Sequence, residues 1–252
     1  MGKEGDESRM PLWEHLDDLR KVIVRSLIAV GLGLIVTYNY SGELVLFLEQ
    51  PLLKVLPEGN RHLYFTGITD KFMVYLLVSF LSSVVLCAPY LFYQLWLFVA
   101  PALYKNERRM VLPFVFFGTF AFLVGLLFGF KVVLPYSYEF LIHFGGESDR
   151  AIITLGEYFS LTLKLLFGIA LIFELPVVLI LLSRFGFVTH PFLVQSRKYA
   201  FMAIATLSAI ITPSPDAVTM IMVMVPLLLL YEISVLGVKW VGKSPGILAE
   251  SK

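Results

Sequence analysis

A short polar island between two long apolar runs carries the side chains with the clearest chemical potential in this sequence. It spans Phe98–Arg109, reads F-V-A-P-A-L-Y-K-N-E-R-R, and contains Lys105, Glu107, Arg108 and Arg109. Charged residues between apolar runs are typical of a membrane surface. Glu107 displayed at such a surface would be an anion able to bind a cationic group. The plain alternative is a solvent-exposed ion pair within the loop, which contributes little to stability.

A single carboxyl group inside a long apolar run is the second candidate for chemistry. Glu174 stands in F-E-L-P, within the run of residues 155–183. A charged side chain at the centre of a bilayer costs roughly 2.5 kcal/mol or more, so such residues usually face a cavity or a partner. Glu174 is therefore a candidate polar site inside the membrane. The structural alternative is a protonated Glu that is hydrogen-bonded within the helix bundle.

Two other carboxylates have ordinary structural explanations. Asp216 follows Pro213 and Pro215, where it can cap the next helix by accepting from free backbone amides. Glu232 interrupts the last apolar run. We expect it near the cytoplasmic interface, where a carboxylate is common.

The motifs of a membrane-bound enzyme are absent from the sequence. It contains neither H-E-x-x-H nor G-x-S-x-G, and its four histidines stand singly in loops or at interfaces. Gly31 and Gly33 form a G-x-G without the third glycine of a dinucleotide-binding loop. We therefore expect a protein that is not an enzyme and has no metal, no cofactor and no nucleic-acid partner.

The composition indicates what kind of scaffold must position these groups. Of 252 residues, 58% are hydrophobic and 15% are charged, with a mean hydropathy of +0.81, whereas a soluble domain is about half apolar and a quarter charged. The apolar residues fall in runs that approach or exceed the roughly 20 residues needed to cross a bilayer as a helix. We predict an all-α membrane protein that forms a single integral membrane domain over residues 1–252.

Six transmembrane helices are predicted, preceded by a cytoplasmic amphipathic helix within residues 1–21. The fifth run has too few residues to cross the bilayer at about 1.5 Å each, and Glu232 interrupts the sixth. The last two helices are therefore predicted to be short, which implies local thinning of the bilayer or a recessed position. The predicted spans cover about 22–40, 72–97, 111–134, 155–183, 199–211 and 217–236.

Prolines and polar stretches shape the segments between and within the spans. Residues 41–71 predict an interfacial helix kinked at Pro51, followed by a turn and an extended stretch. Pro89 is expected to bend the second span, since a proline inside a helix frees a carbonyl group. Pro135–Thr154 is predicted to be a polar loop. This loop is expected on the side of the membrane opposite to the two termini, since most basic residues fall on the side of the termini.

The distribution of basic residues predicts the orientation. Fourteen of the 20 Lys and Arg residues fall on the side of the two termini and of the island Phe98–Arg109. Because cytoplasmic loops carry the excess of Lys and Arg, both termini and this island are predicted to be cytoplasmic. The protein is then a multi-pass protein of the cytoplasmic (inner) membrane.

Several segments, in this order, resemble the TatC family, a component of the twin-arginine protein translocase. The resemblance covers nearly the whole chain, and the order and spacing of its segments make it specific. The segments are P-L-W-E-H-L-D-D-L-R, Q-P-L, A-P-Y-L-F-Y-Q-L-W-L-F-V-A-P-A-L-Y-K-N-E-R-R, F-E-L-P, R-K-Y, T-P-S-P-D and L-L-Y-E-I.

This resemblance implies a receptor and scaffold that binds the twin-arginine signal peptides of folded proteins. With TatA and TatB as membrane partners, and with self-association, such a protein exports its cargo using the proton-motive force. The resemblance implies that signal recognition falls on Phe98, Leu103, Glu107, Asp18 and Arg20. It implies an intramembrane glutamate at Glu174 and an external loop acid at Asp216. It also implies that Pro51 and Pro89 shape the structure.

The chain departs from the family pattern at one position of interest. Many relatives have Glu-Leu-Arg where this chain has Asp18-Leu19-Arg20, so the negative charge persists on a shorter stem. Two adjacent arginines on a peptide require anions on two supports, which Glu107 and Asp18 could supply. A secondary transporter of a small solute is the alternative, suggested by Glu174, a proline-broken span and two short helices.

Overall fold

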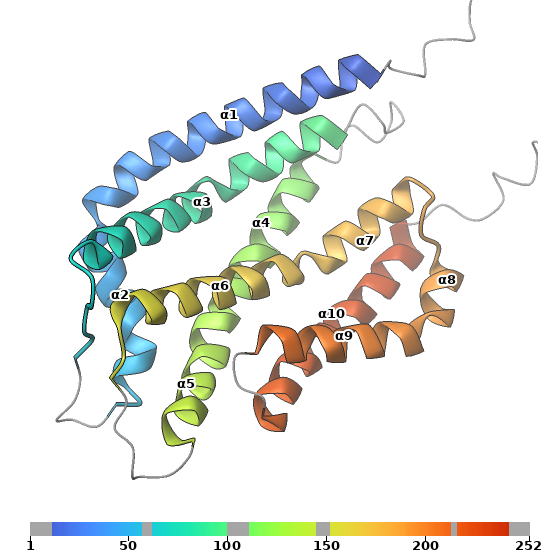
Figure 1. The fold of residues 1–252 in the computed structure, drawn as a ribbon. Helices are drawn as coiled ribbons and strands as arrows, with labels where there is room; N and C mark the ends of the chain where they lie inside the picture. The colour runs from blue at the N-terminus through green and yellow to red at the C-terminus, as the bar shows by residue number, and fades with distance from the viewer. Residues whose placement is uncertain (1–11, 57–61, 100–110, 145–151, 213–215, 242–252) are drawn as a thin grey trace, which may run out of the picture.

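The computed structural model describes residues 12–56, 62–99, 111–144, 152–212 and 216–241. Within these ranges the secondary structure is helical, apart from an isolated β-bridge between Tyr64 and Thr154. Figure 1 shows the helices crossing one another as a bundle of long and short segments. They are α1 (Leu12–Asn39), α2 (Ser41–Leu53), α3 (Asp70–Val99), α4 (Val111–Phe128), the π-helical turn η3 (Gly129–Val133), α5 (Leu134–His143), α6 (Leu155–Phe173), α7 (Leu175–Arg184), α8 (His190–Gln195), α9 (Arg197–Ile211) and α10 (Ala217–Val241).

The first helix pairs with α3 along its length. The predicted amphipathic helix and the run of residues 22–40 join in one unbroken helix, α1, which lies beside α3 in Figure 1. Near one end of the pair, the Thr37 hydroxyl donates to the Ser79 carbonyl oxygen at 2.7 Å. Further along, the Cys87 thiol donates to the Ala29 carbonyl oxygen at 3.4 Å. These contacts fix an antiparallel register between α1 and α3.

The second helix is short and packs by its apolar face against the bundle. Pro51 lies in the last turn of α2, where it is buried, and the helix ends at Leu53. A buried tyrosine, Tyr158 on α6, donates its hydroxyl to the Leu48 carbonyl oxygen. This bond ties α2 to α6 inside the bundle.

The third apolar run forms a longer helical path than the sequence predicted. The predicted polar loop from Pro135 onward is wrong over its first part, because the path continues through η3 and α5 to His143. Pro135 lies in the first turn of α5, where a missing N–H costs little. The wider π-helical turn just before it absorbs the change in backbone hydrogen bonding.

The sixth and seventh helices are two parts of one apolar run, divided at Glu174. Phe173 ends α6 and Leu175 begins α7, with Pro176 in its first turn. Since Pro176 has no N–H to donate, a carbonyl group of the preceding turn loses its usual partner and the run bends. The single run predicted over residues 155–183 is therefore a broken helix.

Close helix crossings hold this broken helix in the bundle. A Cβ atom at Gly125 on α4 would stand 2.8 Å from the Ala170 Cα on α6. A Cβ atom at Gly237 on α10 would stand 2.7 Å from the Ile180 Cδ1 on α7. The crossing at Gly125 depends on the absence of a side chain, as small residues allow in membrane helix pairs, whereas at Gly237 the Ile180 side chain would have to move.

The last two helices differ in length. With 15 residues, α9 is short, as predicted. With 25 residues, α10 is not, so the prediction that both helices are short is wrong for the second. Glu232 does not end α10, and its carboxylate accepts from Arg197 on α9 at 2.7 Å. The neighbouring Tyr231 donates its hydroxyl to the Leu193 carbonyl oxygen of α8 at 2.7 Å.

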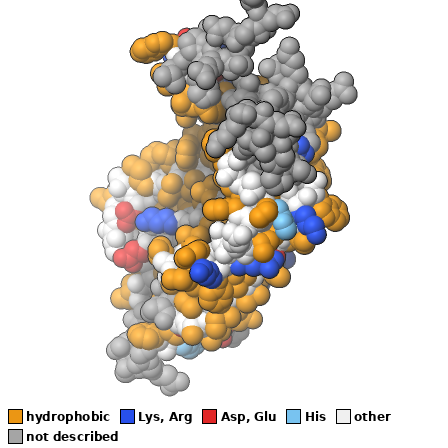
Figure 2. Space-filling model, turned by 90° about the vertical axis from the view of Figure 1, so that its right-hand side faces the viewer, with side chains coloured by type: hydrophobic (Ala, Val, Ile, Leu, Met, Phe, Trp, Pro, Cys, Tyr) orange, Lys and Arg blue, Asp and Glu red, His pale blue; other side chains and the backbone are white. Residues whose placement is uncertain are grey.

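The outside of the bundle is strongly apolar. Figure 2 shows hydrophobic side chains spread over the face in view, with Lys and Arg in small groups. By length and composition, four helical paths in the described ranges could cross a membrane: Asp70–Val99, Val111–His143, Leu155–Arg184 and Ala217–Trp240. The total of six spans and the cytoplasmic position of both termini stay predictions.

Candidate functional site

Three of the predicted signal-recognition residues lie on the paired helices, Asp18 and Arg20 on α1 and Phe98 on α3. From the contact between Ala29 and Cys87, Asp18 lies eleven residues back along α1 and Phe98 eleven residues forward along α3. Because the two helices are antiparallel, Asp18 near the start of α1 and Phe98 near the end of α3 belong to the same end of the pair. A recognition site shared by these two residues, 80 positions apart in the sequence, stays a prediction.

The carboxylate of Asp18 is accessible. Its Oδ1 atom accepts from Lys21 Nζ at 3.0 Å, and the two side chains are 39% and 61% exposed. An exposed pair three residues apart on a helix contributes little, so a second cation can compete for Asp18 at small cost. Arg20 is also exposed, and Phe98 is half-buried. Leu103 and Glu107 lie outside the described residues.

The intramembrane candidate, Glu174, occupies the break between α6 and α7. Its backbone N–H donates to the Leu171 carbonyl oxygen at 3.2 Å, and its side chain is buried, with the residue 8% exposed. Neither carboxyl oxygen has a hydrogen-bond partner of good geometry among the described residues, although the backbone of Phe122 on α4 is near enough to interact. The two interpretations of Glu174, a polar site for a partner and a protonated Glu bonded within the bundle, both stay predictions.

The Glu174 carboxyl group lines a cavity of about 470 Å³ between α3, α4, α6 and α7. Glu174 is the one polar residue among those that line it. An unpaired carboxylate in such surroundings is costly, so a hydrogen-bond donor that reaches Glu174 would stabilise it. The other lining residues are Val84, Ala88, Leu91, Phe92, Leu95, Phe114, Phe122, Leu171, Val177, Val178 and Leu181.

Asp216 caps the last helix. Its Oδ2 atom accepts from the Thr219 backbone N–H at 2.7 Å, and its Oδ1 atom accepts from the Thr219 hydroxyl. This is the geometry of an N-cap aspartate, which confirms the capping interpretation of Asp216 made from the sequence. A role for Asp216 at an external surface stays a prediction.

The sequence interpretation missed one buried polar residue near the candidate recognition site. Gln94 on α3 is 2% exposed; its Nε2 atom donates to the Tyr90 hydroxyl, while its Oε1 atom has no partner in the described part of the chain. A glutamine in an otherwise apolar span was the available signal. Gln94 lies one helical turn before Phe98, on the paired part of α3.

Metal binding has no support in the described ranges. No group of three or more His, Cys, Asp or Glu side chains gathers there.

Comparisons with known proteins agree with the resemblance in the sequence. A family model described as "Sec-independent protein translocase protein (TatC)" matches residues 14–226. A protein of that name from Desulforapulum autotrophicum is 42% identical over 238 residues, which cover 94% of this chain and 87% of that one. A second, from Carboxydothermus hydrogenoformans, is 36% identical, with 94% and 96% covered.

Solved structures share the fold. One described as the crystal structure of the twin arginine translocase receptor TatC has a TM-score of 0.74 and 32% sequence identity. The alignment covers 90% of this chain and 99% of the crystallised chain. A second structure of the receptor, in DDM, has a TM-score of 0.75 and 30% identity, with 91% and 100% covered.

Proposed function

Because this chain belongs to the TatC family of Sec-independent protein translocase proteins, we propose that it is a receptor for twin-arginine signal peptides of folded cargo. It is a membrane protein, and the proposal places it in the cytoplasmic membrane with both termini inside the cell. The antiparallel pairing of α1 and α3, which carries Asp18 and Phe98 to the same end of the pair, is the observation that supports the proposal. The start of α1 and the end of α3 can bind the same peptide only if they lie close together.

The peptide's two arginines require two anions. Asp18 supplies one from α1, and Glu107 supplies the other from the island that begins at Phe98. Each guanidinium presents a planar fork of donors that fits a carboxylate. Phe98 and Leu103 offer apolar contact to the residues beside the arginines, and Arg20 balances the local charge. A lysine pair lacks the fork and binds more weakly.

The apolar part of the signal peptide lies along the bundle, where exposed hydrophobic side chains and the Glu174 cavity are available. Glu174 serves as a polar contact for a partner or for the cargo inside the membrane. TatA and TatB are the membrane partners in this proposal, further copies of the chain join the assembly, and the proton-motive force drives export. Family membership removes the grounds for the small-solute transporter alternative.

Site-specific photocrosslinking tests the receptor proposal. A photoreactive amino acid at Phe98 should crosslink a signal peptide that carries Arg-Arg and should crosslink a Lys-Lys version much less. The same amino acid at Leu112, which is 75% exposed at the start of α4, is the matched control. Equal crosslinking of the two peptides at Phe98, or equal yields at Phe98 and Leu112, would reject the proposal.

A further inference from the structure

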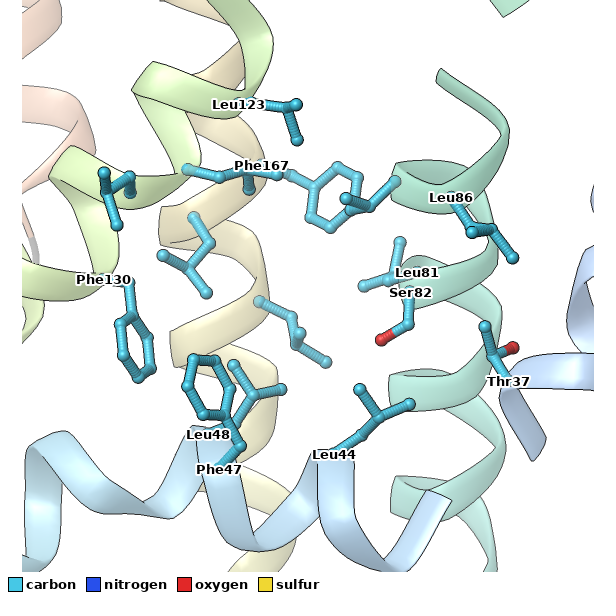
Figure 3. A pocket seen from close by; sticks show the side chains of 15 residues that line it. Thr37, Leu44, Phe47, Leu48, Leu81, Ser82, Leu86, Leu123, Phe130 and Phe167 are labelled. Atoms are coloured by element: carbon cyan, nitrogen blue, oxygen red, sulfur yellow. The ribbon is translucent and has the colours of Figure 1, made fainter. Parts of the chain in front are cut away.

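A second apolar cavity lies beside α2, and the proposed receptor function does not use it. We call it the α2 pocket; its volume is about 500 Å³. Figure 3 shows side chains from α2, α3, α4 and α6 pointing into it. The lining residues are Thr37, Leu44, Phe47, Leu48, Leu81, Ser82, Val85, Leu86, Leu123, Leu126, Leu127, Phe130, Leu163, Leu166 and Phe167.

The chemistry of the α2 pocket suits hydrocarbon. Thr37 and Ser82 are the polar residues in its lining. The Thr37 hydroxyl is already engaged by the Ser79 and Gly33 carbonyl oxygens, at 2.7 and 3.1 Å. A polar ligand would lose its bonds to water and find few replacements, which is costly. An apolar ligand gains from burial roughly in proportion to the area covered.

One end of the α2 pocket is closed. In Figure 3, α2 crosses below the cavity and directs Leu44, Phe47 and Leu48 into it. The ring of Phe47 stacks on that of Phe130, with centroids 4.6 Å apart and an interplanar angle of 13°. Phe130 belongs to the π-helical turn η3, a local widening that often marks functional positions. The stacked pair joins α2 to η3.

The side of the α2 pocket is open to the surroundings of the bundle. Lining residues on three helices are about half exposed, with exposed fractions of 49% for Phe47, 58% for Leu86 and 56% for Leu127. The inner wall is buried, as Leu48 and Leu166 show at 9% and 5%. In a membrane protein, this opening faces hydrocarbon, because α3, α4 and α6 belong to paths long and apolar enough to cross the bilayer.

We propose that the α2 pocket holds the end of one acyl chain of a membrane lipid. A transmembrane helix is about 10–12 Å wide and must continue past its contacts, and α2 lies across that path. An acyl chain ends in a methyl group and can stop against the Phe47–Phe130 pair. The lipid then packs between α2 and the long helices and stabilises this end of the bundle.

Labelling with a photoreactive lipid tests the acyl-chain proposal. The full chain is reconstituted in vesicles of phosphatidylethanolamine and phosphatidylglycerol that contain a phosphatidylcholine with a diazirine at the end of one acyl chain. After irradiation, labelled residues are mapped by mass spectrometry. We expect label on the buried wall residues Leu48 and Leu166, which bulk lipid does not reach, in addition to exposed residues such as Phe116.

Pocket-filling variants provide the control. Ser82→Phe and Val85→Phe each add a ring inside the α2 pocket and should remove label from Leu48 and Leu166 while Phe116 stays labelled. Leu112→Phe changes an exposed position outside the pocket and should leave the pattern unaltered. Circular dichroism and size-exclusion chromatography identify the folded variants; if neither pocket variant folds, the labelling of wild-type Leu48 decides the question.

Two results would overturn the proposal. One is a wild-type protein in which Leu48 and Leu166 carry no label, or folded pocket-filling variants that keep it. The other is evidence that a protein occupies the pocket: a photoreactive amino acid at Leu86, irradiated in native membranes, yields an adduct with a partner helix or a signal peptide instead of a lipid adduct.

Discussion

Gly33 on α1 lies against Cys87 on α3 so closely that a Cβ atom at Gly33 would stand 3.0 Å from the Cys87 Sγ atom. The same cysteine donates to the Ala29 carbonyl oxygen one turn earlier on α1. The two helices therefore approach at a point where a larger side chain has no room. Their register, and with it the relative position of Asp18 and Phe98, depends on this approach.

We predict that Gly33→Leu separates α1 from α3 and lowers signal-peptide crosslinking from Phe98. Overpacking of this kind costs about 1–3 kcal/mol. Thermal unfolding in detergent and the crosslinking yield measure the two effects. Gly31→Leu is the matched control on the same helix, because no atom lies within 4 Å of a Cβ at Gly31. Equal unfolding temperatures and equal crosslinking yields for the two variants would show that the close approach of α1 and α3 affects neither stability nor recognition.

The acidic pair of the proposed recognition site gives a second prediction. Glu107→Ala should abolish crosslinking to an Arg-Arg signal peptide while the protein still inserts in the membrane. Asp18→Asn should weaken crosslinking, and Asp18→Glu should retain it, because the carboxylate persists. Crosslinking of the purified variants to the same peptide measures both.

The neighbouring Asp17 supplies the control for Asp18. It is exposed on the same turn of α1, so Asp17→Asn removes the same charge from an adjacent point. An equal loss in Asp17→Asn and Asp18→Asn would indicate a general effect of charge on α1. Retained crosslinking in Glu107→Ala would exclude the island as an anion donor.

A third prediction concerns the crossing of α4 and α6 that supports the helix break. A Cβ at Gly125 would stand 2.8 Å from a backbone atom, the Ala170 Cα, and 2.9 Å from the Phe173 Cβ. Gly125→Val should therefore push the helices apart and destabilise the protein by about 1–3 kcal/mol. Gly168→Val on α6 introduces the same side chain where no atom lies within 4 Å. Unfolding temperatures in detergent that match for the two variants would contradict the prediction.

The order of the apolar runs was predictable from the sequence because about 20 consecutive apolar residues have few options besides a membrane helix. The helical ends were less predictable where long-range contacts decide them. Glu232 looked like the end of an apolar helix, but its partner Arg197 lies 35 residues away, and such a pairing leaves no local signal. Pro135 looked like the start of a loop, because a π-helical turn before it has no clear sequence pattern.

The candidate site residues also divide into those with a local sequence signal and those that depend on long-range contacts. Glu174 stood out because a carboxyl group in an apolar run is rare and costly, and the structure does place it at a buried break. The placement of Asp18 and Phe98 at the same end of the α1–α3 pair could be expected only from the family resemblance, since it depends on the pairing of two helices. Gln94 was missed because one amide in a long apolar run resembles an ordinary interhelical contact.

The last prediction concerns the Glu174 side chain itself. Both of its carboxyl oxygens are buried without a partner in the described ranges, beside an apolar cavity. If the group contacts a partner or cargo, Glu174→Gln should preserve more export than Glu174→Leu, because an amide keeps an acceptor and a donor in nearly the same volume. Export of a folded reporter with a twin-arginine signal measures this. Val178→Leu, at another lining position, controls for changes in cavity shape. Export by Glu174→Leu at the wild-type level would show that no polar contact is made there.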